Sequence, residues 1–153
     1  MIHGLKYSGN MTGLETFQHL SRQSPVLDDL NIPDLILPVP LHIKRLRQRG
    51  FNQALLLAKK LFPENKEKIQ FDILLRQEDT PTQTGLSGKE RRRNLKNAFI
   101  IKRPSEITGK NILLLDDVLT TGATINECAK ALKTAGCERV EVLTICRAEK
   151  HFP

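Results

Sequence analysis

A chain of 153 residues, 39% of them hydrophobic, is long enough to form one domain around one packed core and too apolar to be disordered. No apolar run approaches the roughly 18 residues of a membrane-spanning helix, and the amino-terminal segment has no apolar signal core, so we expect a cytoplasmic protein without membrane insertion. Lys and Arg outnumber Asp and Glu by 24 to 17, and the net charge of +7 favours anionic partners such as phosphates, diphosphate or nucleic acid.

Short elements are predicted in the first two thirds of the chain. Residues 11–24 have the pattern of a mostly polar helix with an apolar stripe. Residues 34–39 form an apolar run that ends among prolines, which predicts a buried strand leading into a rigid loop. A helix is predicted over residues 51–62, where a proline stops it, and two further strands are predicted at 71–75 and 98–102.

The last third of the chain has the clearest pattern. Residues 111–115 are an uninterrupted apolar run, typical of a strand buried on both faces. A helix follows from about residue 125 to 135, ended by Gly136, and residues 139–147 form another strand. This strand–helix–strand order implies a parallel crossover. We therefore expect a single α/β domain over residues 1–153, an open, mainly parallel sheet flanked by helices.

The residues after this apolar run suit a sugar phosphate. Asp116 and Asp117 are acceptors when ionised, and they can hold two neighbouring hydroxyls or a magnesium ion. Gly122, among three threonines, allows the backbone to approach a ligand closely and to adopt an unusual φ. The helix start beyond it, with Thr124 and Glu127 as a predicted capping box, favours a phosphate. In open, mainly parallel sheets, ligands usually bind at the carboxyl ends of the strands, which is where these residues are expected to lie.

Other interpretations of this segment are weaker. Residues 85–90 lack the spacing and the final hydroxyl of a P-loop, and no G-x-G-x-x-G is present. Phosphoacceptor receiver domains also end a strand with two acids, but they place the pair near the amino terminus. A merely solvated turn would not account for two acids, three threonines and a glycine in one loop.

The cysteines predict no metal site. Cys128, Cys137 and Cys146 are nine residues apart, and none belongs to a C-x-x-C pair, so no zinc is expected in this chain. We expect reduced cysteines in or near the core.

Segment 112–124, ILLLDDVLTTGAT, closely resembles the PRPP-binding motif of type I phosphoribosyltransferases, in which an apolar run is followed by two acids, two apolar residues and T-T-G. More narrowly, the chain resembles the ComF family of competence-associated phosphoribosyltransferase-like proteins. The further blocks that carry this resemblance are PVPLHIKRLRQRGFNQALLLAKKL at 38–61 and TPTQTGLSGKERRRNLKNAF at 80–99. Family members commonly begin with a four-cysteine zinc module, which this sequence does not contain.

The resemblance implies roles for individual residues. Asp116 and Asp117 would hold the ribose hydroxyls, and Mg²⁺ either directly or only through the ligand. The 5-phosphate would be bound by the residues of the loop itself, Thr120, Thr121, Gly122, Ala123 and Thr124. Diphosphate would rest on the loop and basic segment after the first strand, at Val39, Pro40, Lys44, Arg45, Arg47 and Arg49.

The resemblance also implies mobile and variable parts. The basic segment at 80–97 would form a mobile lid, whose Arg91 or Arg92 stabilises the departing diphosphate in a catalytic role beside Asp116 and Asp117. A surface helix and a nucleic-acid patch are the alternatives for this segment. A hood over the acceptor would come from residues 1–30 and parts of 60–80.

Two main classes of function remain open from the sequence, and a structural partner in a competence complex, with a vestigial site, is a third possibility. One is a phosphoribosyltransferase that binds PRPP or ribose 5-phosphate with Mg²⁺ and transfers the pentosyl group to an unidentified acceptor, linked to DNA uptake in natural competence. The other is a non-catalytic module that binds single-stranded DNA or senses a sugar phosphate beside competence proteins, although an aromatic content of 5% argues against base stacking. A homodimer is expected only by analogy with the fold, and a lone histidine such as His42 is more often a packing residue than a catalytic one.

Overall fold

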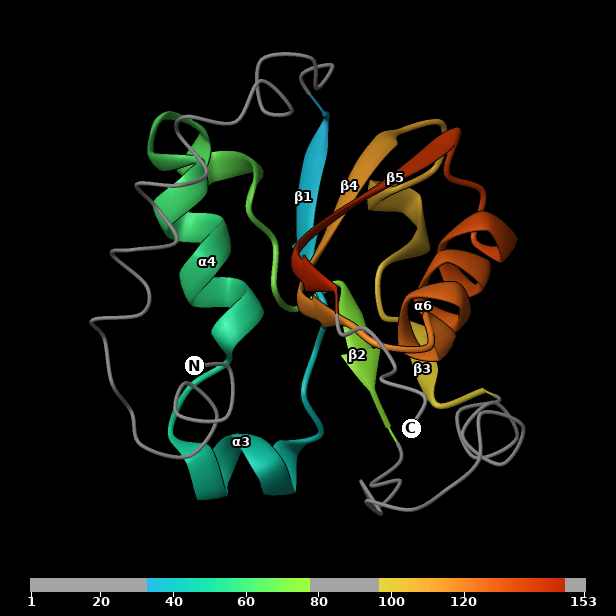
Figure 1. Cartoon of the computed structure of the whole chain (residues 1–153). Helices are drawn as coiled ribbons and strands as arrows, with labels where there is room; N and C mark the ends of the chain where they lie inside the picture. The colour runs from blue at the N-terminus through green and yellow to red at the C-terminus, as the bar shows by residue number, and fades with distance from the viewer. Residues whose placement is uncertain (1–32, 78–96, 148–153) are drawn as a thin grey trace.

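The computed structural model describes residues 33–77 and 97–147. The polar helix predicted at 11–24, the hood segment at 1–30 and the lid predicted at 80–97, apart from its last residue, lie outside these residues. Among the described residues, three strands form the main sheet, in the order β1 (Leu35–Pro38), β4 (Asn111–Leu119) and β5 (Arg139–Arg147). Both pairings are parallel, which confirms the predicted parallel sheet, and the three strands end at the same edge (Figure 1).

A second, smaller sheet pairs the two short strands that flank the basic segment. β2 (Leu74–Arg76) and β3 (Phe99–Ile101) are antiparallel, with Arg76 opposite Phe99. The predicted strands at 71–75 and 98–102 are therefore confirmed in type, although β2 begins later than predicted. The guanidinium of Arg76 lies over the ring of Phe99, 5.6 Å from its centroid.

Two layers cover the main sheet (Figure 1). α4 (Gln53–Leu61) packs on one face, where Ile36, Leu113 and Leu115 belong to its apolar cluster. α6 (Ala123–Thr134) and the β2–β3 pair cover the other face, over the cluster that contains Leu37, Ile112 and Leu114. Residues 112 to 115 of β4 are all buried, because each face of this central strand has its own cover, as an uninterrupted apolar run predicts.

The carboxyl end of α6 confirms the predicted stop. Gly136 has φ 93°, the left-handed conformation that glycine adopts without strain. Its N–H donates to the Lys133 carbonyl at 3.1 Å, and the Cys137 N–H donates to the Leu132 carbonyl at 3.3 Å. These two bonds form a Schellman motif, which satisfies carbonyls that the helix leaves unpaired.

Within the part of the chain that the structure describes, three short helical segments were not predicted. α3 (Ile43–Arg49) lies at the carboxyl edge of the main sheet (Figure 1). It has no buried residue, so its sequence did not need the apolar stripe by which a helix is predicted. The two 3₁₀ segments, η2 (Pro63–Lys68) and η3 (Pro104–Glu106), each begin with a proline. Pro is favoured at a first helical position, because its missing N–H would have no intrahelical partner there.

Candidate functional site

The acid pair lies inside a strand and not in the turn beyond it. Sequence analysis ended this strand at residue 115, but β4 continues to Leu119 because β5 pairs with it along its whole length, with Asp116 beside Thr144 and Leu119 beside Arg147. Both aspartates are partly exposed. The backbone N–H of Asp117 donates to Oδ1 of Asp116 at 2.9 Å, so the first carboxylate lies beside the backbone of the next residue.

The pleat of β4 separates the two carboxylates. Successive residues of a strand face opposite sides of the sheet. Asp116 therefore shares a side with Leu114 and the α6 cluster, whereas Asp117 shares a side with Leu115 and the α4 cluster. A ligand that contacts both carboxylates must reach around the carboxyl end of the strand, since neither face presents the pair together.

The loop after β4 presents the start of α6. Gly122 is the N-cap residue, with φ 73°, and no side chain caps the helix from this position. The predicted capping box at Thr124 and Glu127 is wrong, because α6 begins at Ala123 and Thr124 is already within its first turn. The Ala123 N–H donates to Oγ1 of Thr121 over a long 3.4 Å. A helix start without a side-chain cap offers N–H groups and a partial positive charge to an anion.

Backbone conformation, not space, requires glycine at position 122. A Cβ added there would lie 3.6 Å from Cδ1 of Leu119 and 3.8 Å from Nδ2 of Asn126, both ordinary contacts. The positive φ is the obstacle, because it brings a Cβ too close to the backbone of an L-residue. This confirms the unusual φ expected for Gly122 from the sequence.

The exit of β1 lies directly beside the acid pair. The Val39 N–H donates at 2.8 Å to the carbonyl of Leu115, the residue before Asp116. Val39 and Pro40 are buried, and the N–H and the carbonyl of Val39 both form hydrogen bonds within the fold. The fold thus brings together the two segments, far apart in sequence, that were assigned to ribose and to diphosphate.

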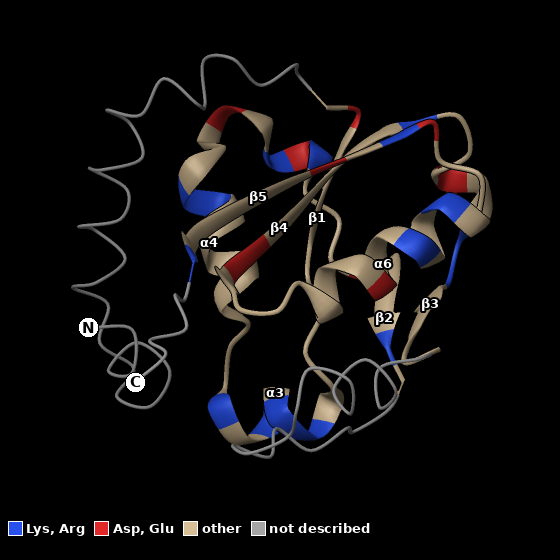
Figure 2. Cartoon of the chain, turned by 45° about the vertical axis from the view of Figure 1, so that its right-hand side comes forward, with Lys and Arg blue, Asp and Glu red and all other residues tan. Residues whose placement is uncertain are grey.

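Positive charge at this edge is concentrated on α3 (Figure 2). The four basic residues assigned to diphosphate are all on this helix, with Arg47 and Arg49 in its last turn. Gly50 ends α3 at φ 77°, and its N–H donates to the Leu46 carbonyl. Figure 2 also shows the acidic segment in the carboxyl-terminal half of β4.

His42 has a structural position. It is 9% exposed and is the N-cap of α3, where its Nδ1 accepts a hydrogen bond from the Lys44 N–H at 3.4 Å. Burial and capping are consistent with the packing role expected for a lone histidine.

Asn52 is a residue of this edge that was not predicted from the sequence. Its Nδ2 donates to the Val39 carbonyl at 3.0 Å, and its Oδ1 accepts from the Ala54 N–H at 3.0 Å. An asparagine just before an apolar helix is a recognisable N-cap signal, but its bond to Val39 depends on the tertiary fold.

The thiols are poor candidates for nucleophiles. Burial raises the pKa of the Cys128 thiol, and the negative charge of Asp116 raises this pKa further. Burial likewise raises the pKa of Cys146, with a contribution from Asp117. All three cysteines are free, as expected, and they stay protonated at neutral pH.

Several predictions are not tested by this geometry. Arg91 and Arg92 lie outside the described residues. Within residues 33–77 and 97–147, no group of three His, Cys, Asp or Glu side chains is placed to hold a metal ion. Among the helices of the same residues, none has the length and apolar character needed to cross a membrane.

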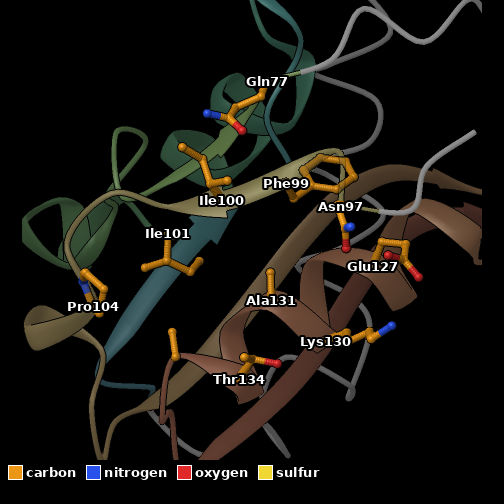
Figure 3. Close-up of a pocket in the computed structure, with 11 residues that line it drawn as sticks. Gln77, Asn97, Phe99, Ile100, Ile101, Pro104, Glu127, Lys130, Ala131 and Thr134 are labelled. Atoms are coloured by element: carbon orange, nitrogen blue, oxygen red, sulfur yellow. The ribbon is translucent and has the colours of Figure 1, made fainter.

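A hollow between β3 and α6 contains none of the predicted site residues (Figure 3). Ile101, Pro104 and Ala131 contribute apolar surface to it, whereas Glu127 and Lys130 lie on the α6 side. None of its lining residues comes from β4, so it is a separate feature from the acid pair.

Comparison with known proteins identifies the family. The family model described as "Phosphoribosyl transferase domain" matches residues 46–151. The chain is 42% identical over 120 residues to "Competence protein F" of Haemophilus influenzae, covering 78% of this chain and 52% of that protein. It is 40% identical over 118 residues to "DNA utilization protein YhgH" of Escherichia coli K12, covering 77% and 51%. The chain thus spans about half the length of these curated relatives.

Solved structures support the same fold. A hypoxanthine-guanine phosphoribosyltransferase from Bacillus anthracis matches 89% of this chain and 69% of its own, with a TM-score of 0.54 at 15% identity. A hypoxanthine phosphoribosyltransferase from Staphylococcus aureus matches 86% and 62%, with a TM-score of 0.52 at 16% identity. The chain therefore belongs to the phosphoribosyl transferase domain family and, within it, to the ComF group of competence-associated proteins.

Proposed function

We propose that the carboxyl edge of the sheet binds PRPP or ribose 5-phosphate together with Mg²⁺. The observation that carries this proposal is the uncapped start of α6 at Gly122, directly after the strand that bears Asp116 and Asp117. A phosphate site and a pair of hydroxyl acceptors are then joined by one short loop. A pentose 5-phosphate carries a phosphate at one end and a vicinal diol at the other, so each end has a suitable partner in this segment.

Each part of this ligand has a chemically suitable partner. The loop from Thr120 to Thr124 supplies backbone N–H groups and hydroxyls for the 5-phosphate. The carboxylates of Asp116 and Asp117, one on each side of β4, accept from the ribose hydroxyls. The backbone after Val39 and the cations of α3 suit diphosphate, because guanidinium groups match phosphate oxygens in a bidentate manner.

The acid pair fits Mg²⁺ only in part. Because Asp116 and Asp117 face opposite sides of the sheet, they do not form a chelating clamp from one face. A single carboxylate together with ligand oxygens is a common arrangement for this ion, which retains several waters. When bound, Mg²⁺ would neutralise charge on the diphosphate; holding it mainly through the ligand fits these residues best.

The reaction that this site supports is pentosyl transfer. The bond between C1 of the ribose and diphosphate oxygen breaks, and its electron pair leaves with diphosphate. A nucleophile then forms the new bond to C1. Positive charge on the ribose is stabilised by the carboxylates of β4, and the departing diphosphate by the arginines of α3, with Arg91 and Arg92 proposed for the same task. The acceptor is not assigned.

Titration calorimetry with PRPP and Mg²⁺ tests the proposal. We expect binding by the wild-type chain, and a loss of about 10-fold to 100-fold in affinity for Asp117→Asn, the range for a charged hydrogen bond. Glu138→Gln is the matched control, since it removes the same charge from an exposed residue at the amino end of β5. A folded wild-type chain that shows no heat with PRPP would refute the sugar-phosphate site.

A second candidate function is binding of single-stranded DNA. The exposed basic helix α3 favours it, because four cations on a helix with no buried residue can follow a phosphate backbone. The names of two relatives, "Competence protein F" and "DNA utilization protein YhgH", support a function connected with DNA.

Salt dependence separates the two functions. If α3 tracks DNA, the affinity for a labelled oligonucleotide falls steeply with salt, and Arg47→Gln with Arg49→Gln reduces this dependence by about one unit of slope per lost phosphate contact. Asp117→Asn should leave DNA affinity unchanged. Equal loss of DNA binding in Asp117→Asn and in the α3 variant would contradict a separate DNA surface.

A further inference from the structure

Val39, the first residue after β1, forms hydrogen bonds through both its N–H and its carbonyl. The Val39 N–H donates to the Leu115 carbonyl of β4 at 2.8 Å. The Val39 carbonyl accepts from Nδ2 of Asn52 at 3.0 Å, across 13 residues of sequence. Both backbone groups of Val39 are therefore used, one to continue the sheet and one to hold the far end of the loop.

The same side chain begins a helix. Asn52 has φ −104° and ψ 118°, the extended conformation of an N-cap residue, and its Oδ1 accepts from the Ala54 N–H at 3.0 Å. A carboxamide supplies an acceptor for the cap and a donor for Val39 at once. A carboxylate at this position would cap the helix but has no donor, and the shorter serine side chain caps the helix without the amide's reach.

Between these two tied points lies a loop that carries α3. This segment, residues 40–51, contains a helix with no buried residue, so apolar packing of the helix contributes little to its placement. The hydrogen bond between Asn52 and Val39 closes the base of the loop. Loop ends held together restrict the positions that the intervening residues can take.

We propose that Asn52 is a positioning residue that holds the α3 loop against the carboxyl edge of the sheet and so sets the affinity for the anionic group bound there. The identification of this anionic group as diphosphate rests on the proposed function. The role of Asn52 in placing the loop does not depend on that function. Asn52 acts through Val39 and α3 and does not touch the ligand.

The variant Asn52→Ser isolates this role. Serine is as good an N-cap as asparagine, so α4 keeps its start while the bond to Val39 is lost. Asn65→Ser is the matched control, the same replacement within η2 at a partly exposed residue. Thermal unfolding of both variants first shows that each is folded.

Hydrogen exchange followed by mass spectrometry then measures loop placement without any ligand. We expect amides within residues 40–51 to exchange about fivefold to thirtyfold faster in Asn52→Ser, from the loss of one partly buried hydrogen bond and the unpaired carbonyl that remains. Exchange within α4 and throughout Asn65→Ser should match the wild type. Unchanged exchange in residues 40–51, or faster exchange in α4 as well, would overturn the positioning role.

Calorimetry with Mg²⁺–diphosphate and, separately, with ribose 5-phosphate tests the consequence for binding. Asn52→Ser should weaken diphosphate about fivefold to thirtyfold and leave ribose 5-phosphate within about twofold. An equal loss for both ligands would overturn the assignment to the diphosphate side. If the wild type binds neither ligand, the proposed function fails, and the exchange result still decides whether Asn52 places the loop.

Discussion

The two helices that flank the carboxyl edge are built in opposite ways. α6 buries Ala123, Ile125, Cys128 and Leu132 against the sheet, so its start is fixed by the core. α3 buries nothing and is defined by polar contacts at its ends, where His42 caps it and Gly50 terminates it. Both helices lie at the carboxyl edge of the sheet, but only α6 is part of the packed interior.

This difference suggests that the site combines a rigid part and an adjustable part. A phosphate at the start of α6 would meet N–H groups already held in place by the core, and preorganised donors cost little to use. A second anionic group would meet cations displayed on a helix whose placement depends on a few hydrogen bonds. Stability and ligand affinity should therefore respond separately to changes in the two regions.

The largest expected effect is on stability. Leu114 is fully buried in β4, and Leu114→Ala should lower the free energy of unfolding by about 2–5 kcal/mol, through lost burial and the cavity left behind. Leu46→Ala, on the partly exposed side of α3, should cost less than about 1 kcal/mol. Urea unfolding of both variants measures this contrast. Similar losses would mean that α3 is as much part of the core as β4.

A pair of glycines sharpens the comparison. Gly122 and Gly50 both have a positive φ and space for a Cβ, so each change to Ala should cost about 1–2 kcal/mol of conformational strain. Only Gly122→Ala should also weaken ribose 5-phosphate binding, by about tenfold, because relief of the strain moves the N–H groups at the start of α6. Calorimetry on both variants provides the readout, and equal binding by the two would contradict a phosphate site at Gly122.

Charge removal from α3 should change affinity without changing stability. Arg47→Gln should weaken PRPP binding about twofold to fivefold, as for other exposed ion pairs, and less so at high salt. Lys59→Gln removes the same charge from an exposed position on α4 and serves as control. An effect of the same size in the control would indicate a general response to net charge.

The smallest expected effect lies outside both flanking helices. Arg103 donates to both carboxylate oxygens of Asp72, at 2.8 Å each, and this contact lowers the pKa of Asp72 below its ordinary value. The pair therefore contributes stability above the unfolded pKa of Asp72 and loses it as the pH falls through the lower folded value. Because the pair is solvent-exposed, its contribution is small.

Thermal unfolding between pH 3 and pH 7 measures this contribution. Asp72→Asn should unfold slightly below the wild type at pH 7, and the difference should shrink below about pH 4. PRPP affinity should not change in this variant. A difference in stability that grows toward acid pH would contradict a stabilising contribution from ionised Asp72.

The sequence by itself determined the elements that carry their own apolar pattern. The apolar runs at 34–39 and 111–115 predicted two strands of the sheet, because a strand covered on both faces must be apolar in sequence. The third strand was predicted from the mixed apolar and polar segment 139–147, which has no buried residue. The acid pair and the glycine loop were located for a similar reason: their chemistry is local, and the resemblance to a known motif is contained in 13 consecutive residues.

Tertiary structure decided what depends on distant partners. β4 extends through Asp116 and Asp117 because β5 pairs with it, and this pairing places the two carboxylates on opposite faces. α3 has no buried face, so no apolar periodicity in the sequence predicted it. The hydrogen bond from Asn52 to Val39 joins residues that are 13 positions apart in the sequence. Local patterns record which side of an element is buried; they do not record which backbone groups a fold brings within hydrogen-bonding distance.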